Sequence, residues 1–384
     1  MRIGISAAYR MHGGGLVHLR NLLKAWTRTG ITKKHSIILF TRPENLAALQ
    51  LAPESGIEIQ LAGGRIFNLL GKLIWEQVMF PRLLAQIKPD VVFCPGNIVP
   101  LLSPVPTVVA YRNAAPFCSS VTLRATGASN WLAYKALGVL MRLSARAARR
   151  VIFISHSFKS LFVKRFGFHP ERGDVIYHGR DGLSEERPDR SLLDQLGIIS
   201  PYILCVAHLQ PYKNLPALIE GYAVAQQTLQ RCGLRLVLAG KPATERYGRR
   251  LAAQIRQRGL DGWVRLVGNL PHRDVASLLA HCQFLVFQST CENCPTALIE
   301  ALEAGVPVVC SDASVMPEIA GDNALYYDPF DSRDIARALT RLAEDRALRA
   351  ELGEKARRHA LKFPTWAEVG QMTMHTLERA VKGP

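Results

Sequence analysis

Two carboxylates lie eight residues apart behind a short apolar segment in the second half of the chain. Glu292 lies in the turn after the apolar run Phe284 to Phe287, and Glu300 lies in the helix that Pro295-Thr296 is expected to start. The N–H groups and positive dipole at such a helix start favour anions, and a carboxylate accepts hydrogen bonds from hydroxyls. The segment therefore predicts a site for a phosphorylated sugar. A generic strand-to-helix turn with exposed acids is the alternative.

A lysine lies in a second polar loop. The expected strand Tyr202 to Val206 runs through His208 into Tyr212-Lys213-Asn214, just before an expected helix at Leu215. Lysine at a helix start can place a point charge on a diphosphate and stabilise it as a leaving group. Taken alone, this pattern favours a surface lysine.

Glycine dominates the turn after the first expected strand. Gly13-Gly14-Gly15 follows Ile3 to Ser6, and glycines allow a backbone to approach a ligand closely. The G-x-G-x-x-G pattern of dinucleotide-binding proteins is absent. A flexible turn is therefore the alternative here.

The elements that must position these residues alternate between strands and helices in both halves of the chain. Apolar runs predict strands at 3–6, 37–40, 57–61, 91–93, 107–110, 151–154, 175–177, 202–206, 234–239, 264–267, 284–287 and 306–310. This order predicts an α/β protein with two doubly wound, Rossmann-like domains, whose ligands bind at the carboxyl ends of the strands in a cleft between them. We expect an N-terminal domain at 1–182, a polar linker at 183–200 and a C-terminal domain at 201–364.

Composition limits the class of protein. A length of 384 residues, with 48% hydrophobic and 21% charged residues, is typical of two globular domains. The net charge of +17 favours phosphates, nucleic acid or anionic lipid as partners. No helix-turn-helix, RNA-recognition or zinc-finger pattern supports nucleic acid. The densest basic stretch, Arg142, Arg146, Arg149 and Arg150, is either a solvated face or a surface for a membrane or an acidic partner.

The cysteines and the first strand indicate the cellular compartment of the protein. Cys94, Cys205, Cys282 and Cys310 lie in apolar runs, which indicates buried, reduced thiols in a cytosolic protein. Cys291 and Cys294 form a single C-x-x-C pair without the second pair that a zinc site needs, so no metal is expected. No signal peptide is expected before a strand that starts at Arg2, and the predicted location is cytoplasmic.

Taken together, these segments resemble the retaining glycosyltransferases of family 4, which have the GT-B fold. The spacing of Glu292 and Glu300 is similar to that family's E-x7-E motif. The resemblance continues through four further segments: 301–309, Pro317-Glu318-Ile319, Gly321-Asp322-Asn323-Ala324 and Tyr212-Lys213-Asn214. In the first half, Trp75-Glu76-Gln77 and 88–92 resemble a recurring pattern. The resemblance spans nearly the whole chain and is strongest from 200 to 330.

The resemblance implies a role for each matched position. Lys213 would hold the diphosphate of a UDP- or GDP-sugar, Glu300 would bind the ribose, and Glu292 would contact the donor sugar. Backbone groups of the turn and helix start would bind phosphate, and glycines of the first domain would close over it. The implied donor-binding set is Gly14, Gly15, His208, Lys213, Glu292, Asn293, Cys294, Pro295, Thr296, Ala297 and Glu300. The implied reaction is transfer to a hydroxyl with retention at the anomeric carbon, without a metal or a resident cofactor.

The chain departs from the family pattern at three places. His208 stands where an arginine is often found, so one phosphate contact would be weaker or depend on pH. Arg112 and Asn113 follow the strand at 107–110 where many members have His-Asp; either could contact the sugar, and the alternative is that this loop serves only the acceptor or the fold. His178-Gly179 replaces the more usual Asn-Gly. The implied catalytic set is Glu292, Lys213, Arg112 and Asn113.

Some alternatives stay open. Another GT-B enzyme, such as a sugar-nucleotide epimerase, or a non-catalytic basic binding protein would share part of this pattern. The amphipathic stretch Ile66 to Leu84 is either a core helix of the first domain or a membrane-docking helix for a lipid-linked acceptor. The resemblance also implies that the last helix, 365–384, packs on the first domain. A role in cell-envelope or exopolysaccharide synthesis is the expectation at the level of the family.

Overall fold

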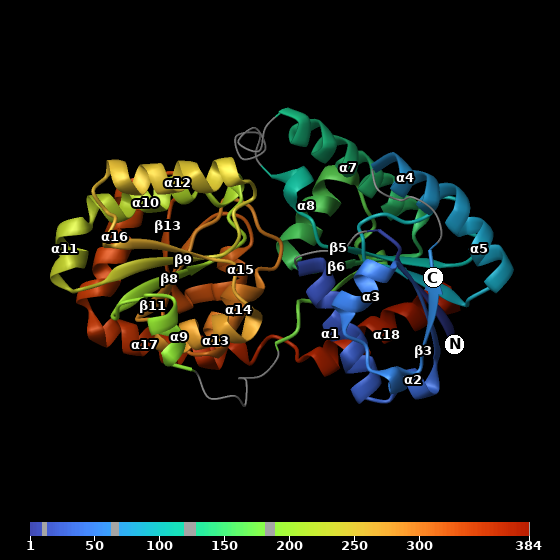
Figure 1. The fold of residues 1–384 in the computed structure, drawn as a ribbon. Coiled ribbons are helices and arrows are strands. Elements are labelled where there is room, and N and C mark those ends of the chain that lie inside the picture. Colours follow the sequence, from blue (N-terminus) through green and yellow to red (C-terminus); the bar gives the residue numbers. More distant parts are fainter. Residues whose placement is uncertain (10–13, 63–68, 119–127, 181–188, 384) are drawn as a thin grey trace. The chain divides into compact units, whose positions relative to one another are not determined.

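The computed structural model describes residues 1–9, 14–62, 69–118, 128–180 and 189–383. The chain divides into two compact units. Unit 1 comprises Met1–Phe117, Leu132–Gly179 and Pro364–Pro384, and unit 2 comprises Cys118–Trp131 and Arg180–Phe363. Each unit contains one parallel sheet with helices on its faces (Figure 1), so the prediction of two Rossmann-like α/β folds is confirmed. Part of the expected linker, 181–188, lies outside the described residues.

The sheet of unit 1 has seven parallel strands in the order β3-β2-β1-β4-β5-β6-β7. Its strands are β1 (Arg2–Ala7), β2 (Ser36–Thr41), β3 (Ile57–Leu61), β4 (Val91–Cys94), β5 (Thr107–Tyr111), β6 (Arg150–Phe153) and β7 (Gly173–Val175). Most of these runs are apolar throughout because both faces of the sheet are covered. The order reverses between β1 and β4, which makes their carboxyl ends the switch point of this sheet.

Two layers of helices enclose this sheet (Figure 1). One layer contains α1 (Gly14–Arg28) and α18 (Trp366–Lys382), which pack together; the Trp26 Nε1 group donates a hydrogen bond to the Gly370 carbonyl at 3.0 Å. The other layer contains α4 (Leu69–Ile74), the π-helical turn η2 (Trp75–Met79), α5 (Phe80–Ile87), α7 (Ala128–Ala147) and α8 (His156–Phe166). Short elements complete the unit: α2 (Ile31–Lys34), α3 (Pro43–Leu49), η1 (Pro53–Ser55), η3 (Ala115–Phe117) and η4 (Pro170–Arg172).

The stretch Ile66 to Leu84 has two kinds of apolar side chain. Trp75 and Phe80 are buried in the core of unit 1 and stack at 4.6 Å between ring centroids. Ile74 and Met79 are exposed. The helix therefore belongs to the core on one side and presents apolar side chains to solvent on the other, while residues 66–68 lie outside the described part of the chain.

The sheet of unit 2 has six parallel strands in the order β10-β9-β8-β11-β12-β13. They are β8 (Tyr202–Val206), β9 (Arg235–Ala239), β10 (Val264–Gly268), β11 (Phe284–Phe287), β12 (Val308–Ser311) and β13 (Ala324–Tyr327). The last of these, β13, was not expected from the sequence, because its polar flanks and short apolar run do not stand out from the helices around it. The strand expected at 175–177 is displaced to 173–175.

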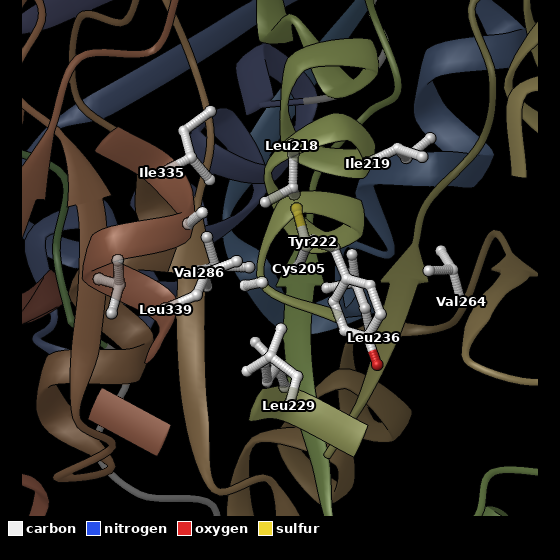
Figure 2. Packing of buried hydrophobic residues seen from close by; sticks show 14 of the residues in the cluster. Cys205, Leu218, Ile219, Tyr222, Leu229, Leu236, Val264, Val286, Ile335 and Leu339 are labelled. Atoms are coloured by element: carbon white, nitrogen blue, oxygen red, sulfur yellow. The ribbon is translucent and has the colours of Figure 1, made fainter. Parts of the chain in front are cut away.

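Helices cover both faces of this second sheet. They are α9 (Ser191–Gln195), η5 (Pro211–Lys213), α10 (Leu215–Val224), α11 (Gln226–Arg231), α12 (Glu245–Gln257), α13 (His272–His281), α14 (Thr296–Glu303), α15 (Met316–Ala320), η6 (Gly321–Asn323), α16 (Ser332–Glu344) and α17 (Arg346–Ala360). Figure 2 shows Leu218 and Tyr222 of α10 beside Cys205 of β8, with Ile335 and Leu339 of α16 nearby. Gly221 permits this close packing, because a Cβ there would lie 2.5 Å from Ile335 Cγ2.

The cysteines follow the expectation only in part. Cys94, Cys205 and Cys310 are buried free thiols, as predicted, whereas Cys282 is a free thiol that is only partly buried. Burial raises the pKa of the Cys205 thiol to about 11. Cys291, however, forms a disulfide with Cys118 rather than standing as a free thiol. The two cysteines are 173 positions apart in the chain, with Cα atoms 5.9 Å apart, a proximity that sequence spacing does not reveal.

Candidate functional site

Two loops meet at the switch point of the unit 2 sheet. The strand order reverses between the neighbouring strands β8 and β11, and the loop after β8 carries Lys213 while the loop after β11 carries Glu292. In parallel α/β sheets, ligands bind at such a point because the two loops diverge and leave room between them. The fold therefore places both predicted residues where a ligand site is expected.

Lys213 and Glu292 form an ion pair in the structure. The lysine side chain is 7% exposed and the glutamate side chain 15% exposed. The ammonium also lies 4.7 Å from the centroid of the Phe287 ring, a cation–π contact. The Ser289 hydroxyl donates to the same Glu292 Oε1 at 2.8 Å. An anion that enters this point can replace the carboxylate as the partner of the lysine, which leaves Glu292 available to accept hydroxyl hydrogen bonds.

Hydrogen bonds fix the two loops to each other. The backbone N–H and the hydroxyl of Thr290 both donate to the Tyr212 carbonyl, at 3.0 and 2.7 Å. The buried Gln288 amide donates to the carbonyls of Asn214 and Pro329. Asn214 itself has left-handed backbone angles, φ 46° and ψ 43°, which asparagine tolerates better than most residues. These contacts hold Lys213 in place before any ligand arrives.

Sequence reasoning missed Gln288 and Ser289. Both are buried polar residues directly after the apolar strand β11. A polar pair at the carboxyl end of a buried strand was the available signal, since such positions in α/β sheets face the ligand edge. Without the fold, nothing distinguished these two residues from the other polar residues of the loop.

The helix α14 starts beside this pair. Pro295 is its N-cap and provides no side-chain hydrogen bond to the first turn, which contains Thr296 and Ala297. The N–H groups of a helix start without a side-chain cap are available to bind an anion. Asn293 and Cys294 are buried in the preceding turn. The start of α14, which follows Glu292 closely in the chain, therefore has N–H groups of the kind that bind anions.

Glu300 lies in the second turn of α14 and contacts a histidine that the sequence did not single out. His272, the first residue of α13, places its Nε2 atom 2.9 Å from Glu300 Oε1. The Glu300 side chain is 27% exposed, so its carboxylate is within reach of a ligand. His208, which follows β8, is exposed, and the Gln210 amide lies 2.8 Å from its Nδ1 atom.

The remaining predicted residues belong to unit 1. Arg112 and Asn113 follow β5, and both backbone N–H groups donate to Oδ1 of Asn97, at 2.8 and 3.1 Å. Gly14 and Gly15 form the first turn of α1; a Cβ on Gly14 would meet no atom within 4 Å. Asn97, which has a positive φ of 70°, was missed because it positions the loop through its side chain from a different strand end.

A buried histidine pair lies in unit 1. The Nδ1 atoms of His18 and His178 are 3.1 Å apart, and the Trp366 ring lies edge-on to His18. Burial, together with the nearby positive charge of Arg112, lowers the pKa of His178 to about 3 and holds the pKa of His18 well below its ordinary value. Both imidazoles are therefore neutral at pH 7, and one must donate to the other.

Two surface hollows in unit 2 lie away from these residues. One is lined by Gly305, Pro307 and arginines of α17, next to the start of β12, and is therefore at the amino edge of the sheet rather than at the ligand edge. The other is formed by residues 321–323 and the end of α17. Across the described residues, no group of three or more potential metal ligands occurs. No helix in the described part is long and apolar enough to cross a bilayer.

Comparison with known proteins identifies the family. Residues 12–181 match the family model described as Glycosyltransferase Family 4, and residues 196–359 match the model described as Glycosyl transferases group 1. The chain therefore belongs to the group 1, family 4 glycosyltransferases with a GT-B fold.

Individual relatives are distant. The O-antigen chain mannosyltransferase B of Escherichia coli is 25% identical over 240 residues, covering 60% of this chain and 61% of the relative. The chain thus matches about three fifths of that relative's length. The crystal structure of Anabaena HepE in complex with UDP and glucose superimposes with a TM-score of 0.75 and 22% identity, over 98% of this chain and 99% of that one. WaaG, a glycosyltransferase involved in lipopolysaccharide biosynthesis, gives a TM-score of 0.74 at 16% identity, over 98% and 99% of the two chains. These structural likenesses establish the fold.

Proposed function

We propose that this glycosyltransferase moves a sugar from a UDP- or GDP-sugar to a hydroxyl of a glycan or lipid-linked acceptor, with retention at the anomeric carbon. The observation that carries the proposal is the Lys213–Glu292 pair beside the start of α14, at the switch point of the unit 2 sheet. A cation, an uncapped helix start and a carboxylate together match a diphosphate joined to a sugar.

Each residue of the site has a role in this proposal. Lys213 and the N–H groups of Thr296 and Ala297 neutralise the diphosphate, whose charge grows as the bond to the sugar breaks. Glu292, once released by the lysine, accepts hydrogen bonds from the donor sugar. Glu300 accepts hydrogen bonds from the ribose. The positive charge that stabilises the leaving group thus comes from the chain itself.

The proposed chemistry proceeds on one face of the sugar. The acceptor hydroxyl attacks from the side of the leaving diphosphate, through a state with oxocarbenium character, and the diphosphate oxygen takes the hydroxyl proton. In unit 1, Arg112 and Asn113 are assigned to the sugar, and Gly14 and Gly15 are assigned to the diphosphate. Closure of the two units around the donor would exclude water from the reacting bond.

Relatives support the class of substrate. The HepE structure contains UDP and glucose, and the E. coli relative is a mannosyltransferase for the O-antigen chain. We therefore place the reaction in the synthesis of a cell-envelope polysaccharide or exopolysaccharide. The proposed location is the cytoplasm, with peripheral attachment to the inner face of the cytoplasmic membrane.

The first test is the thermal stability of the protein with excess UDP, GDP or ADP, alongside Lys213→Ala. A ligand at 100 times its dissociation constant stabilises the folded state by about 2.7 kcal/mol, which shifts the melting temperature measurably. We expect a shift with one nucleotide and none in the variant. If no nucleotide shifts the native protein, the donor site as proposed is wrong. A product that forms only in the presence of an acceptor then separates a transferase from an epimerase.

A further inference from the structure

One face of unit 1 lacks exposed acidic side chains among its described helices. The helices α4, η2, α5, α7 and α8 cover the same side of the sheet (Figure 1). Among the residues whose side chains the structure describes, their lysines and arginines are Arg82, Lys135, Arg142, Arg146, Lys159, Lys164 and Arg165. Their only acidic residue is Glu76, which is 2% exposed. These helices therefore expose basic but no acidic side chains among their described residues, whereas α3 and α18 carry exposed acids such as Glu44 and Glu368.

The helix α7 presents an apolar stripe on its solvent side. Leu132, Val139 and Leu143 are 62%, 59% and 38% exposed, and they recur with helical spacing. Met141 and Ala145 of the same helix are buried in the core, so the stripe faces away from the sheet. The lysine and arginines Lys135, Arg142 and Arg146 lie along one edge of this stripe and are also exposed. A helix that packs on a core with one side normally has polar residues on its solvent-facing side.

The loop between β4 and β5 extends the apolar surface. Leu102 is 87% exposed at its tip. The loop is tied to both neighbouring helices, since the Leu101 N–H donates to Gln77 Oε1 at 2.9 Å and the Val99 N–H donates to Ser144 Oγ at 3.2 Å. Gln77 belongs to η2, and three apolar residues in or next to η2 are exposed. These are Ile74, Val78 and Met79.

We propose that this surface binds the headgroup region of an anionic phospholipid bilayer. The docking face is defined by its apolar residues Ile74, Val78, Met79, Leu102, Leu132, Val139 and Leu143, with Lys135, Arg142 and Arg146 at its edge. A basic amphipathic helix of this kind lies in the plane of the interface, with its apolar side among the acyl chains and its cations among the phosphates. The proposal gives the peripheral attachment in the proposed function a specific surface.

Charge distinguishes the bilayer from other occupants of this face. A second copy of the chain would bring the basic side chains of two such helix layers together, and like charges across an interface are unfavourable. A nucleic acid would use the cations but would leave the leucine and valine stripe exposed, since its backbone offers no apolar surface. An anionic bilayer binds both the cations and the apolar stripe. Each lysine or arginine near its surface raises the affinity roughly fivefold.

The test is sedimentation of the full chain with phosphatidylcholine vesicles, with and without phosphatidylglycerol, in the absence of donor and acceptor. We expect binding to the phosphatidylglycerol vesicles at low salt, weaker binding at high salt because the charges are screened, and little binding to phosphatidylcholine alone. Equal binding to both kinds of vesicle, or none to either, would overturn the proposal.

Matched variants locate the surface. Leu132→Glu with Val139→Glu should lower vesicle affinity at least tenfold, whereas Val224→Glu with Leu361→Glu in unit 2 makes the same charge change at exposed apolar positions and should lose far less. Arg142→Gln with Arg146→Gln should lose about 25-fold, against little for Arg246→Gln with Arg250→Gln on α12. Equal losses in test and control pairs would overturn the assignment.

Two further readouts keep the interpretation clear. The melting shift with nucleotide should be unchanged in the α7 variants, because Lys213 and α14 lie in unit 2; its retention shows that the variants are folded. Failure of vesicle binding with an intact nucleotide shift refutes the docking face and leaves the transferase proposal standing. Light scattering of the native protein should show no self-association through this face. A dimer that Leu132→Glu with Val139→Glu disrupts would identify a second copy as the occupant, and would also refute the proposal.

Discussion

The carboxyl edges of the two sheets are built differently. At the edge of unit 2, Lys213 and Glu292 form a compensated ion pair, and Glu300 contacts His272, so charges are present and partly accessible. At the edge of unit 1, His18 and His178 are buried and neutral beside Arg112. Both edges arise from the same strand order, with a switch point between two central strands.

From this difference we infer that the two edges suit two kinds of ligand. In a charged edge, the lysine has an internal carboxylate partner until a phosphate replaces it, and the carboxylate then becomes available to hydroxyl groups. A buried, neutral edge next to one arginine instead suits hydroxyl groups, which hydrogen bond without bringing a net charge. Breaking the two edges separately should therefore affect donor binding and transfer in different ways.

The largest effect is expected at the charged edge. Lys213→Ala should abolish the nucleotide-induced melting shift and reduce the transfer rate by about 10²- to 10³-fold, because the leaving diphosphate loses its main counter-charge. Initial rates and melting curves measure both. The variant also leaves Glu292 without its cation, so Lys213→Ala with Glu292→Ala serves as the control: it should regain stability but not nucleotide binding. A double variant that still binds nucleotide would contradict the assignment.

Changes at the neutral edge should lower the transfer rate without weakening donor binding. Arg112→Ala is expected to leave the nucleotide melting shift intact while lowering the transfer rate by about 10²-fold, as misplacement of a reacting group does. Arg112→Lys retains the charge but loses the planar fork, so it tells whether shape or charge matters. If Arg112→Ala abolished the nucleotide shift as Lys213→Ala does, the two edges would not have separate roles.

Within the charged edge, Glu300 and His272 should contribute unequally. Glu300→Ala removes the proposed ribose acceptor and should weaken nucleotide binding at least about tenfold, whereas His272→Ala removes only an orienting contact and should weaken it about threefold. Calorimetric titration with the nucleotide identified above measures both constants. The order of these two effects is the critical result, because a larger loss in His272→Ala would assign the ribose contact to the histidine.

The last prediction concerns the pH dependence of stability and involves neither donor binding nor transfer. Burial and Arg112 lower the pKa values of His18 and His178 in the folded protein, so below the ordinary histidine pKa of about 6.5 the unfolded chain binds more protons. The stability from these neutral imidazoles is therefore complete above pH 6.5 and is lost as pH falls, by up to about 1.4 kcal/mol per pH unit for each histidine. Melting temperatures from pH 7 to pH 5 should decline less steeply in His18→Gln with His178→Asn. An unchanged slope would show that other groups carry the dependence.

The fold could be anticipated from the sequence to a large extent. Fully apolar runs such as Val91 to Phe93 and Phe284 to Phe287 indicate strands buried on both faces, and their alternation with amphipathic segments leads to parallel α/β sheets. The short strand β13 and the π-helical turn at Trp75–Met79 were not anticipated. Neither element has a local sequence signature, because β13 forms by pairing with β12 and the π-helical turn forms as Trp75 packs on Phe80.

The sequence by itself determined which residues carry charge and, for strands such as those before Lys213 and Glu292, about where the strand ends. It therefore identified Lys213, Glu292 and Glu300 as candidates, because polar residues after apolar strands lie at the ligand edge of a parallel sheet. Only the tertiary structure decided which partners they meet: the Lys213–Glu292 pair spans 79 positions, and His18 contacts His178 across 160. Such pairs depend on strand order and helix packing, which are properties of the whole chain and not of any local pattern. For the same reason, only the tertiary structure shows that one side of α7 packs in the core while the other side is exposed.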